Sequence, residues 1–562
     1  MPRAGWVVLI VIAVLVLIVI AIPFFISAND FRPTLESKLS QAAGRQVKVG
    51  NLSLSIFSGG ISADDLSVAD DPAFSSSPFL RAKSLKIGVR LMPLIFSHQL
   101  NITDLTIDQP QAALIENPSG RWNISSLGST AKDAAPSPSA RKPASKQPTP
   151  AEPQSTGSAE PLTLSAQLVK VADGRFSIGS TNAKTKPEVF EHVNLELRDV
   201  AVDRAFPFSL SAQVVGGGDI HVQGNAGPLN TSDLVMTPVT SSFNVNHLDL
   251  DASGFVQPST GIAGIVSVNG TTSSNGQEVQ AKAHLTADRW KLAVGGTPVN
   301  KPLTVDASTN YDLARRTGTI TSGDVRVGND TVKLGGTYNL AGDVPSVNMN
   351  ASGTNLPLTD LATALSALDI VLPAGSSIQG GTLTAHFQMQ GPADRLITTG
   401  PVRIDNARLA GFSLLSKISD VARLGGAQTS TGQNTEIQTA STNVRSAPDG
   451  TALSDIKIVA PSIADLSGSG TISPQHVLNF QMTVTLAGGS GSLLAAVGRQ
   501  SNLKIPFFIQ GTSSHPDFKP NVQGIAQQEL KRALGGAIGN NSNSTGNAVG
   551  GILNGILGGK KK

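Results

Sequence analysis

Hydrophobic and polar residues alternate along most of the chain, most clearly at residues 52–56 and 85–89, where every second residue is aliphatic. Successive side chains of a β-strand point to opposite faces, so a period of two predicts strands with one apolar and one polar face. Further runs of this kind lie at residues 102–107, 193–197, 208–214, 243–248, 279–285, 325–334, 383–389 and 477–486. We therefore predict a mainly β protein of one-sided antiparallel strands with a few short helices.

The first apolar segment of the chain shows no alternation of apolar and polar residues. Residues 6–26, from Trp6 to Ile26, contain no charged side chain. As a helix this run would be about 31 Å long, which matches the roughly 30 Å hydrocarbon core of a bilayer. A cleaved signal peptide would have a shorter apolar region and a small residue where Ile26 stands. We therefore expect an uncleaved transmembrane anchor over residues 1–28, with Pro23 near its far end.

The charges around the predicted anchor indicate its direction. Arg3 and the amino terminus precede it, whereas the residues that follow carry both signs of charge, including Asp30 and Arg32. Because positive flanking charges stay in the cytoplasm, the short N-terminus is predicted to be cytoplasmic and the bulk of the chain to lie across the membrane.

A short amphipathic helix is predicted directly after the anchor. Asn29 or Asp30 can cap it, its apolar residues, among them Leu35 and Leu39, recur at every fourth position, and Gly44 can end it. Such a helix either packs against the end of a sheet or lies as a collar on the membrane surface. The narrow apolar stripe favours packing.

Composition divides the rest of the chain. Residues 29–128 are predicted to hold the exit helix and the first strands, and residues 161–534 a second β-rich body. Between them, residues 129–160 are rich in Pro, Ala and Ser and lack large apolar side chains, which predicts a disordered linker. Residues 535–562 are rich in Gly and Asn and are expected to be a flexible tail. Short helices are expected at residues 358–368, 413–424 and near 493–497.

Residues that usually carry chemistry are absent or scattered. The chain has no Cys, which excludes disulfides, thiolate metal sites and a thiol nucleophile. Its 43 basic and 40 acidic residues form no basic face, so nucleic acid is not an expected partner. The acidic pairs Asp64-Asp65 and Asp70-Asp71 stand beside turns, where Asp caps backbone groups. No common catalytic motif is present, so we expect no enzymatic activity, no cofactor and no metal site.

One known family shares the order of segments seen here. The predicted span and exit helix are followed by the stretches GRQVKVGNLSLSIFSGGISADDLSVADDPAF, PFLRAKSLKIGVRLMPLIF and LTIDQPQAALIENPSGRWNISSL. In this order, these segments closely resemble the N-terminal region of AsmA-family proteins. Segments that begin at Gly400 and Ile505 are similar to that family's C-terminal region, which is expected from about residue 380. Between residues 160 and 380, the only similarity to the family is the abundance of predicted strands.

The resemblance implies a single-pass protein of the bacterial inner membrane whose periplasmic part helps to maintain the outer membrane. It also implies an elongated antiparallel β-sheet that curls, taco-like, into a groove for phospholipid. Such a groove has a physical purpose, since each methylene exposed to water costs about 0.8 kcal/mol. The candidate lining residues near the membrane end are Leu52, Leu54, Ile56, Leu85, Ile87 and Val89.

Two other interpretations stay open. The same apolar residues can form a closed core that never contacts lipid, and the chain would then be a scaffold that assists outer-membrane protein assembly. The expected partners are membrane phospholipid and the inner membrane, together with outer-membrane or periplasmic proteins. A surface adhesin is a third interpretation, and it would require cleavage after Ala28.

Overall fold

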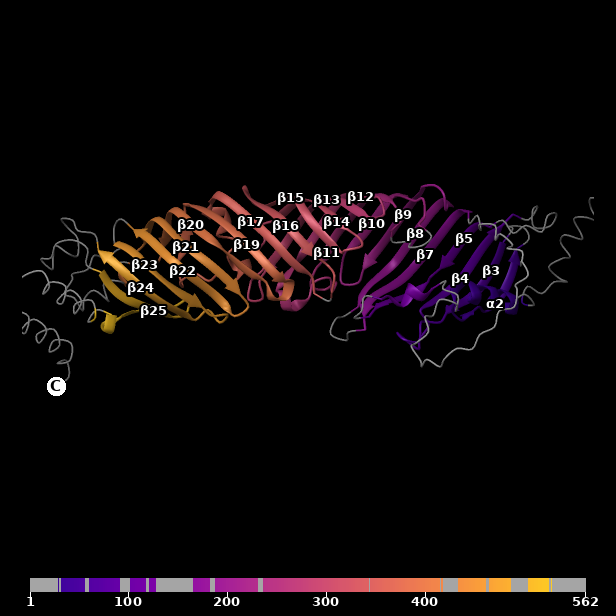
Figure 1. Ribbon diagram of the computed structural model, residues 1–562, viewed down its shortest axis with the longest axis horizontal. Coiled ribbons are helices and arrows are strands. Elements are labelled where there is room, and N and C mark those ends of the chain that lie inside the picture. Colours follow the sequence, from indigo (N-terminus) through magenta and orange to yellow (C-terminus); the bar gives the residue numbers. More distant parts are fainter. Residues whose placement is uncertain are drawn as a thin grey trace, which may run out of the picture. The chain divides into compact units, whose positions relative to one another are not determined.

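The computed structural model describes residues 29, 32–55, 60–90, 102–117, 121–127, 165–181, 187–230, 236–342, 344–414, 416–417, 433–460, 464–486, 504–524 and 527. The predicted anchor with Trp6, Pro23 and Ile26, the predicted linker at 129–160 and the tail at 535–562 lie outside these residues. Among the residues described, no helix has the length and apolar character needed to cross a bilayer. The chain is mainly β, as predicted, with few helices (Figure 1).

The chain divides into two units. Unit 1 holds the described residues of 1–289, 305–319 and 340–343, and unit 2 those of 290–304, 320–339 and 344–562. The elements up to the boundary are α2 (Arg32–Ala43), β1 (Val47–Lys48), β2 (Leu52–Ser55), β3 (Gly60–Val68), β4 (Leu80–Val89), β5 (Ile102–Asp108), β6 (Gln111–Glu116), η2 (Asn123–Ser126), β7 (Ser165–Ser180), β8 (Glu188–Ala201), β9 (Phe206–Val214), β10 (Asp219–Ala226), β11 (Val239–Asp249), η4 (Pro258–Thr260) and β12 (Ile262–Ser274).

Three strands contribute residues to both units, and the remaining elements belong to unit 2. The shared strands are β13 (Glu278–Leu292), β14 (Leu303–Asp312) and β15 (Thr317–Val327). Those of unit 2 are β16 (Asp330–Asn339), β17 (Ser346–Pro357), α4 (Leu358–Leu361), η5 (Ser366–Leu368), β18 (Ser377–Gln379), β19 (Thr382–Pro392), η6 (Ala393–Arg395), β20 (Ile397–Ala410), β21 (Thr435–Ala447), β22 (Gly450–Ala460), β23 (Ala464–Ile472), β24 (Leu478–Leu486), β25 (Lys504–Gly511) and β26 (Pro516–Pro520).

Most strand pairs among the described residues are antiparallel, as predicted, but β7 is an exception. It pairs in parallel with both β5 and β6, for example Leu105 with Val169 and Ala112 with Phe176. The prediction of a purely antiparallel sheet was therefore wrong here. Parallel neighbours need a long crossover, and the chain between Glu116 and Ser165, which includes the Pro-rich segment, is long enough to be one.

The helix predicted after the anchor is α2, and it packs against the sheet. Leu35, Leu39 and Ala43 contact a buried cluster from β1 to β4, which confirms the packing interpretation. Gly44 ends the helix with φ of 65°, as expected for a left-handed C-terminal residue. Asn29 has a different role from the predicted cap, since its Oδ1 accepts a hydrogen bond of 2.8 Å from the backbone N–H of Leu52.

Unit 2 has a core of its own at its C-terminal strands. Val484 and Phe507 are at most 1% exposed, and they pack with Ile456, Leu466 and other apolar residues of β22 to β25. The predicted helix at 358–368 appears as the two short pieces α4 and η5, whereas the predicted run at 325–334 is divided between β15 and β16. Of the predicted helix at 413–424, only residues 413–414 and 416–417 are described, and the one near 493–497 lies outside the described residues.

β-Bulges recur at polar residues with positive φ. His247 on β11 and Asn355 on β17 have φ of 51° and 53°, and each lies where the strand register shifts. Asn, Asp and His tolerate this conformation better than other non-glycine residues, and a bulge bends its strand and increases the local twist. The residue after the positive-φ residue is buried at Asp65-Leu66, His192-Val193, Asp199-Val200, His247-Leu248, Asn355-Leu356, Asn406-Ala407 and Asp455-Ile456.

Replacing Asn355 with Val should destabilise the protein by about 1–2 kcal/mol, because a β-branched side chain clashes with the backbone at positive φ. Asn355→Gly removes the same amide without that clash and should cost much less. Thermal unfolding of the purified chain, followed by circular dichroism, measures both. Equal losses for the two variants would mean that the amide, and not the backbone conformation, stabilises this bulge.

Asp330 is a buried carboxyl in unit 2. It begins β16, is 3% exposed, and neither carboxyl oxygen has a hydrogen-bond partner among the described residues. Burial, and then the neighbouring Asp360 carboxylate, raises the pKa of Asp330. Asp360 is in the opposite situation, because a 2.9 Å hydrogen bond from Lys301 Nζ lowers its pKa.

We expect Asp330→Asn to stabilise the protein by about 1–3 kcal/mol at pH 8, where the native side chain would be a buried and unpaired charge. Because the pKa of Asp330 is raised on folding, its contribution to stability is present when it is protonated and is lost as pH rises through the folded-state pKa. The advantage of the variant should therefore vanish below about pH 4. Denaturation at several pH values tests this, and a pH-independent difference would argue against it.

Candidate functional site

Strands β7 to β12 of unit 1 place apolar side chains in continuous rows across the sheet. Val171 pairs with Leu195, Leu195 with Leu210, Leu210 with Val222, and Val222 with Phe243. A second row on the same face, two positions away, contains Val169, Leu197 and Phe208, and a third contains Ala212, Ile220, Val245 and Val268. These rows make one face of the strands mainly apolar, although Ser241 of β11 and Thr272 of β12 continue the second row.

The opposite face of the same strands is polar. Its rows follow the same pairing register and are displaced from the apolar rows by one residue along each strand. The first polar row is Lys170, Glu196, Ser209, Gln223, Ser242 and Thr271. The second is Asn194, Ser211, His221, Asn244 and Asn269. This separation is what the alternation in the sequence predicts for strands with one apolar face.

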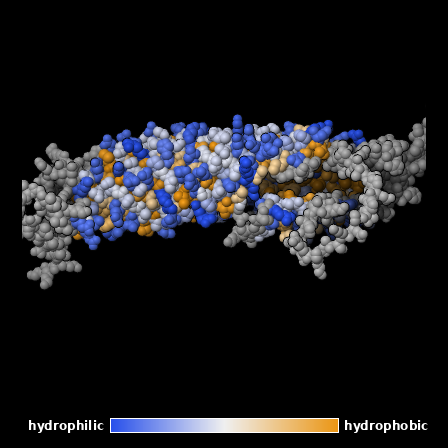
Figure 2. Space-filling view, in the orientation of Figure 1, coloured by the Kyte–Doolittle hydropathy of each residue, from blue (hydrophilic) through white to orange (hydrophobic). Residues whose placement is uncertain are grey.

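The apolar face of β7 to β12 is only partly covered. Leu210, Val222 and Phe243 are all of intermediate exposure, unlike the fully buried residues beneath α2. Figure 2 shows a hollow in unit 1, beside the strands that Figure 1 labels β7 and β8, with a hydrophobic wall. A partly covered apolar surface gains about 25 cal/mol for each Å² that a nonpolar ligand removes from water. The face can therefore bind hydrocarbon.

Unit 2 continues the same design. One row crosses eight of its strands, and every member is apolar: Leu356, Leu383, Ile404, Ala440, Ile458, Leu466, Val484 and Ile505. The row changes character along its length. Leu383, Ile404 and Ile458 are of intermediate exposure, whereas Leu466 and Val484 belong to the buried core. The accessible part of this apolar face therefore lies toward β19 to β22.

A glycine leaves space for an aromatic ring on the apolar face of unit 1. Gly270 is the residue of β12 opposite Phe243 of β11. A Cβ at position 270 would lie 2.3 Å from the carbonyl oxygen of Lys282 and 2.6 Å from Cζ of Phe243. The ring therefore occupies the space of the missing side chain, and the face stays open above it.

Charges are confined to the polar face and to the strand ends. Arg175 Nη1 pairs with Glu191 Oε1 at 2.7 Å, and His192 Nδ1 lies 2.8 Å from Asp173 Oδ1. The hydrogen bond from His192 lowers the pKa of the exposed Asp173 carboxyl. Glu188 is different, since it pairs with Ile178 at the end of the apolar face and burial raises its pKa. The three apolar rows that cross β7 to β12 contain no charged side chain.

The structure brings three of the predicted lining residues, Leu52, Leu85 and Ile87, into one apolar cluster near α2. Leu52 and Leu85 are each 7% exposed, and Ile87 packs against the same cluster. Leu54 and Val89 lie in β2 and β4, and Ile56 lies outside the described residues. That these residues line a groove stays a prediction. Because α2 covers this cluster, the accessible apolar face of unit 1 is found further along the sheet, at β7 to β12.

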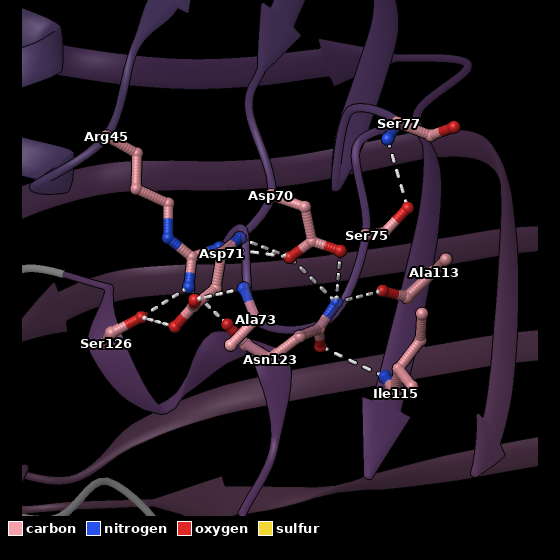
Figure 3. Close-up of polar contacts among 10 residues, drawn as sticks. All are labelled: Arg45, Asp70, Asp71, Ala73, Ser75, Ser77, Ala113, Ile115, Asn123 and Ser126. Carbon is pink, nitrogen blue, oxygen red and sulfur yellow. Dashed lines mark hydrogen bonds and ion pairs between the residues drawn. The ribbon is translucent and has the colours of Figure 1, made fainter. Parts of the chain in front are cut away.

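A buried polar cluster fixes the region next to α2 (Figure 3). Arg45 Nη1 lies 3.4 Å from Asp70 Oδ1, and their side chains are 6% and 2% exposed. Asn123 Nδ2 donates to both oxygens of Asp70 at 3.2 and 3.1 Å, and also to the carbonyl of Ala113 at 2.8 Å. Arg45 Nη2 donates to Ser126 Oγ at 2.6 Å. The cluster thus ties η2 to β6 and to the loop after α2.

The acidic pair Asp70-Asp71 combines the predicted turn role with an unpredicted one. Asp71 Oδ1 accepts a 3.0 Å hydrogen bond from the N–H of Ala73, and this bond is the main reason for its lowered pKa. That part confirms the interpretation as turn chemistry. The buried ion pair of Asp70 with Arg45 was missed, since no local pattern links residues so far apart in the chain.

Comparison with known proteins places the chain in a family. A family model described as the AsmA family matches residues 1–362. No curated protein and no solved structure matches the chain. The match ends before the segments at Gly400 and Ile505, so their resemblance to the C-terminal region stays a prediction. Because the match spans more than half of the 562 residues, the chain belongs to the AsmA family.

Proposed function

We propose that this protein handles phospholipid in the maintenance of the bacterial envelope and that it binds acyl chains on the apolar faces of its sheets. Membership of the AsmA family indicates an envelope-related function. The observation that carries the proposal is the partly covered apolar row from Val171 to Phe243. A closed core would bury such a row, as Leu466 and Val484 are buried in the C-terminal core of unit 2.

The energetics favour an acyl chain as the ligand. Covering about 15 methylenes in water would save about 12 kcal/mol, and the apolar rows of β7 to β12 offer no charge that would oppose this. The bulges at His192 and His247 bend the strands, which favours a sheet that curls around a guest. In this proposal the sheets form an elongated groove, and the phospholipid headgroup stays in contact with water.

The location follows from the same proposal. Residues 6–26 anchor the chain in the inner membrane, the N-terminus is cytoplasmic, and both units lie in the periplasm. The protein carries out no catalysis and needs no cofactor, since its task is to shield hydrocarbon from water. Its partners are phospholipid, the inner membrane, and outer-membrane or periplasmic proteins that deliver or receive the lipid.

Lipid extraction from the detergent-purified full chain tests the proposal. Mass spectrometry should find about one or more phospholipids per chain, above the amount retained by an unrelated single-span protein purified in parallel. If the two proteins retain the same amount of lipid, the scaffold function becomes the better account. In that case the chain should instead co-purify with outer-membrane proteins that await assembly.

A further inference from the structure

A long channel lies on the polar face of β7 to β12, opposite the apolar rows. An open pocket of about 680 Å³ is lined by members of both polar rows and of the apolar row between them. The apolar residues on either side of that middle row, such as Leu197, Phe208 and Val245, do not line it. A pocket on the apolar face would contact these neighbours, so the pocket lies on the polar face, between two rows of polar side chains.

The shape of the channel suits an extended ligand. It runs across the strands from Lys170 on β7 to Thr271 on β12. With about 4.8 Å between neighbouring strands, its length is about 24 Å. Two rows on one face of a sheet are about 7 Å apart along the strands, so the channel is narrow. A linear oligomer fits this space better than a compact molecule.

The chemistry of the channel is neutral and rich in hydrogen-bonding groups. Its walls carry amide and hydroxyl side chains, and the charged Lys170 and Glu196 lie directly opposite each other with opposite signs. In the part of the chain that the structure describes, Gln223, Asn244 and Asn269 form no side-chain hydrogen bond with another protein group. Each amide therefore offers two donors and one acceptor to a ligand.

We propose that this channel binds a linear, uncharged glycan. Sugar hydroxyl and acetamido groups both donate and accept hydrogen bonds, which matches amide and hydroxyl walls without net charge. An extended peptide is a poorer match, since it would add to a sheet edge and not to a sheet face. This proposal does not rest on the lipid function, because the channel and the apolar rows occupy opposite faces of the same strands.

Calorimetric titration of the detergent-purified full chain with chitopentaose tests the proposal. Chitopentaose should bind, and chitobiose, which spans less of the channel, should bind at least about tenfold more weakly. The double variant Asn244→Ala/Asn269→Ala should lower the affinity for chitopentaose about tenfold, through the loss of several hydrogen bonds. Asn225→Ala is the matched control, since Asn225 lies exposed on the same face of β10 but outside the channel, and it should bind as the native protein does.

Three results would overturn the proposal. The first is that chitopentaose does not bind at millimolar concentration. The second is that an uncharged extended peptide binds more tightly than chitopentaose. The third is an equal loss of affinity in Asn225→Ala and in the double variant, which would place the sugar elsewhere on the polar face.

Discussion

Replacing Val222 with Asp should remove bound phospholipid from the purified chain. Val222 lies at the centre of the apolar row of unit 1, between Leu210 and Phe243, and its side chain is only partly covered. A carboxylate there would have to lose its hydration against the acyl chain, at a cost of several kcal/mol. Because each 1.4 kcal/mol is a factor of ten in affinity, lipid retention should fall to about a tenth or less. Lipid mass spectrometry of the purified variant measures this.

Asn225→Asp is the control for that variant. It places the same charge on the same strand, β10, but on the exposed polar face, so phospholipid retention should not change. Thermal unfolding of both variants separates loss of lipid from loss of fold. If Val222→Asp unfolds normally and still retains native amounts of phospholipid, the lipid is not bound on this face.

Arg45→Ala should cause the largest loss of stability. The substitution leaves the Asp70 carboxylate, whose side chain is 2% exposed, without its cationic partner. Removing one partner of a buried ion pair typically costs about 3–5 kcal/mol. The hydrogen bonds of Arg45 to η2 are lost as well. Denaturant unfolding that monitors unit 1 should therefore show a markedly lower midpoint.

Two further variants test whether the burial of the Arg45–Asp70 ion pair causes this loss of stability. Arg32→Ala removes the partly exposed pair with Glu36, which should cost less than about 1 kcal/mol. The double variant Arg45→Ala/Asp70→Ala should recover part of the stability, because no unpaired charge remains in the interior. A small effect of Arg45→Ala, comparable to that of Arg32→Ala, would show that the cluster does not hold this region together.

The sequence predicted the class of fold because alternation is a local signal. Each strand carries its own period of two, so the runs around Leu195, Leu210 and Val222 identify β8, β9 and β10 without any knowledge of their neighbours. The same period predicts one apolar and one polar face. Which strands pair, and in which register, depends on contacts between distant residues, and a single sequence does not contain them.

The bulges and the parallel pairing show this limit. At Asn355-Leu356 the apolar period slips by one residue, and a polar residue that tolerates positive φ stands at the slip. That combination recurs often enough to serve as a signal, but it becomes recognisable only once one bulge has been seen. No comparable signal marks the parallel pairing of β6 with β7, because it joins residues that are far apart in the chain.

The sequence predicted apolar faces, whereas the lining of a groove by Leu52, Leu85 and Ile87 stays a prediction. Aliphatic alternation at Leu52 and Leu85 correctly indicates an apolar face there. Whether a face is sealed depends on what packs against it, and α2 covers this one through Leu35 and Leu39. At β7 to β12 the same alternation leaves a partly covered surface. The sequence pattern of the two regions is alike, and only the three-dimensional arrangement separates them.

Photo-crosslinking in living cells tests the central claim most directly. A benzoylphenylalanine at Val222 or Phe243 would stand on the apolar face of β10 or β11, whereas one at Asn225 or Thr240 would stand on the polar face of the same strands. After irradiation of cells with radiolabelled phospholipid, the two apolar positions should capture lipid and the two polar positions should not. Labelling that is absent at Val222 and Phe243, or equal at all four positions, would contradict an apolar face that holds lipid.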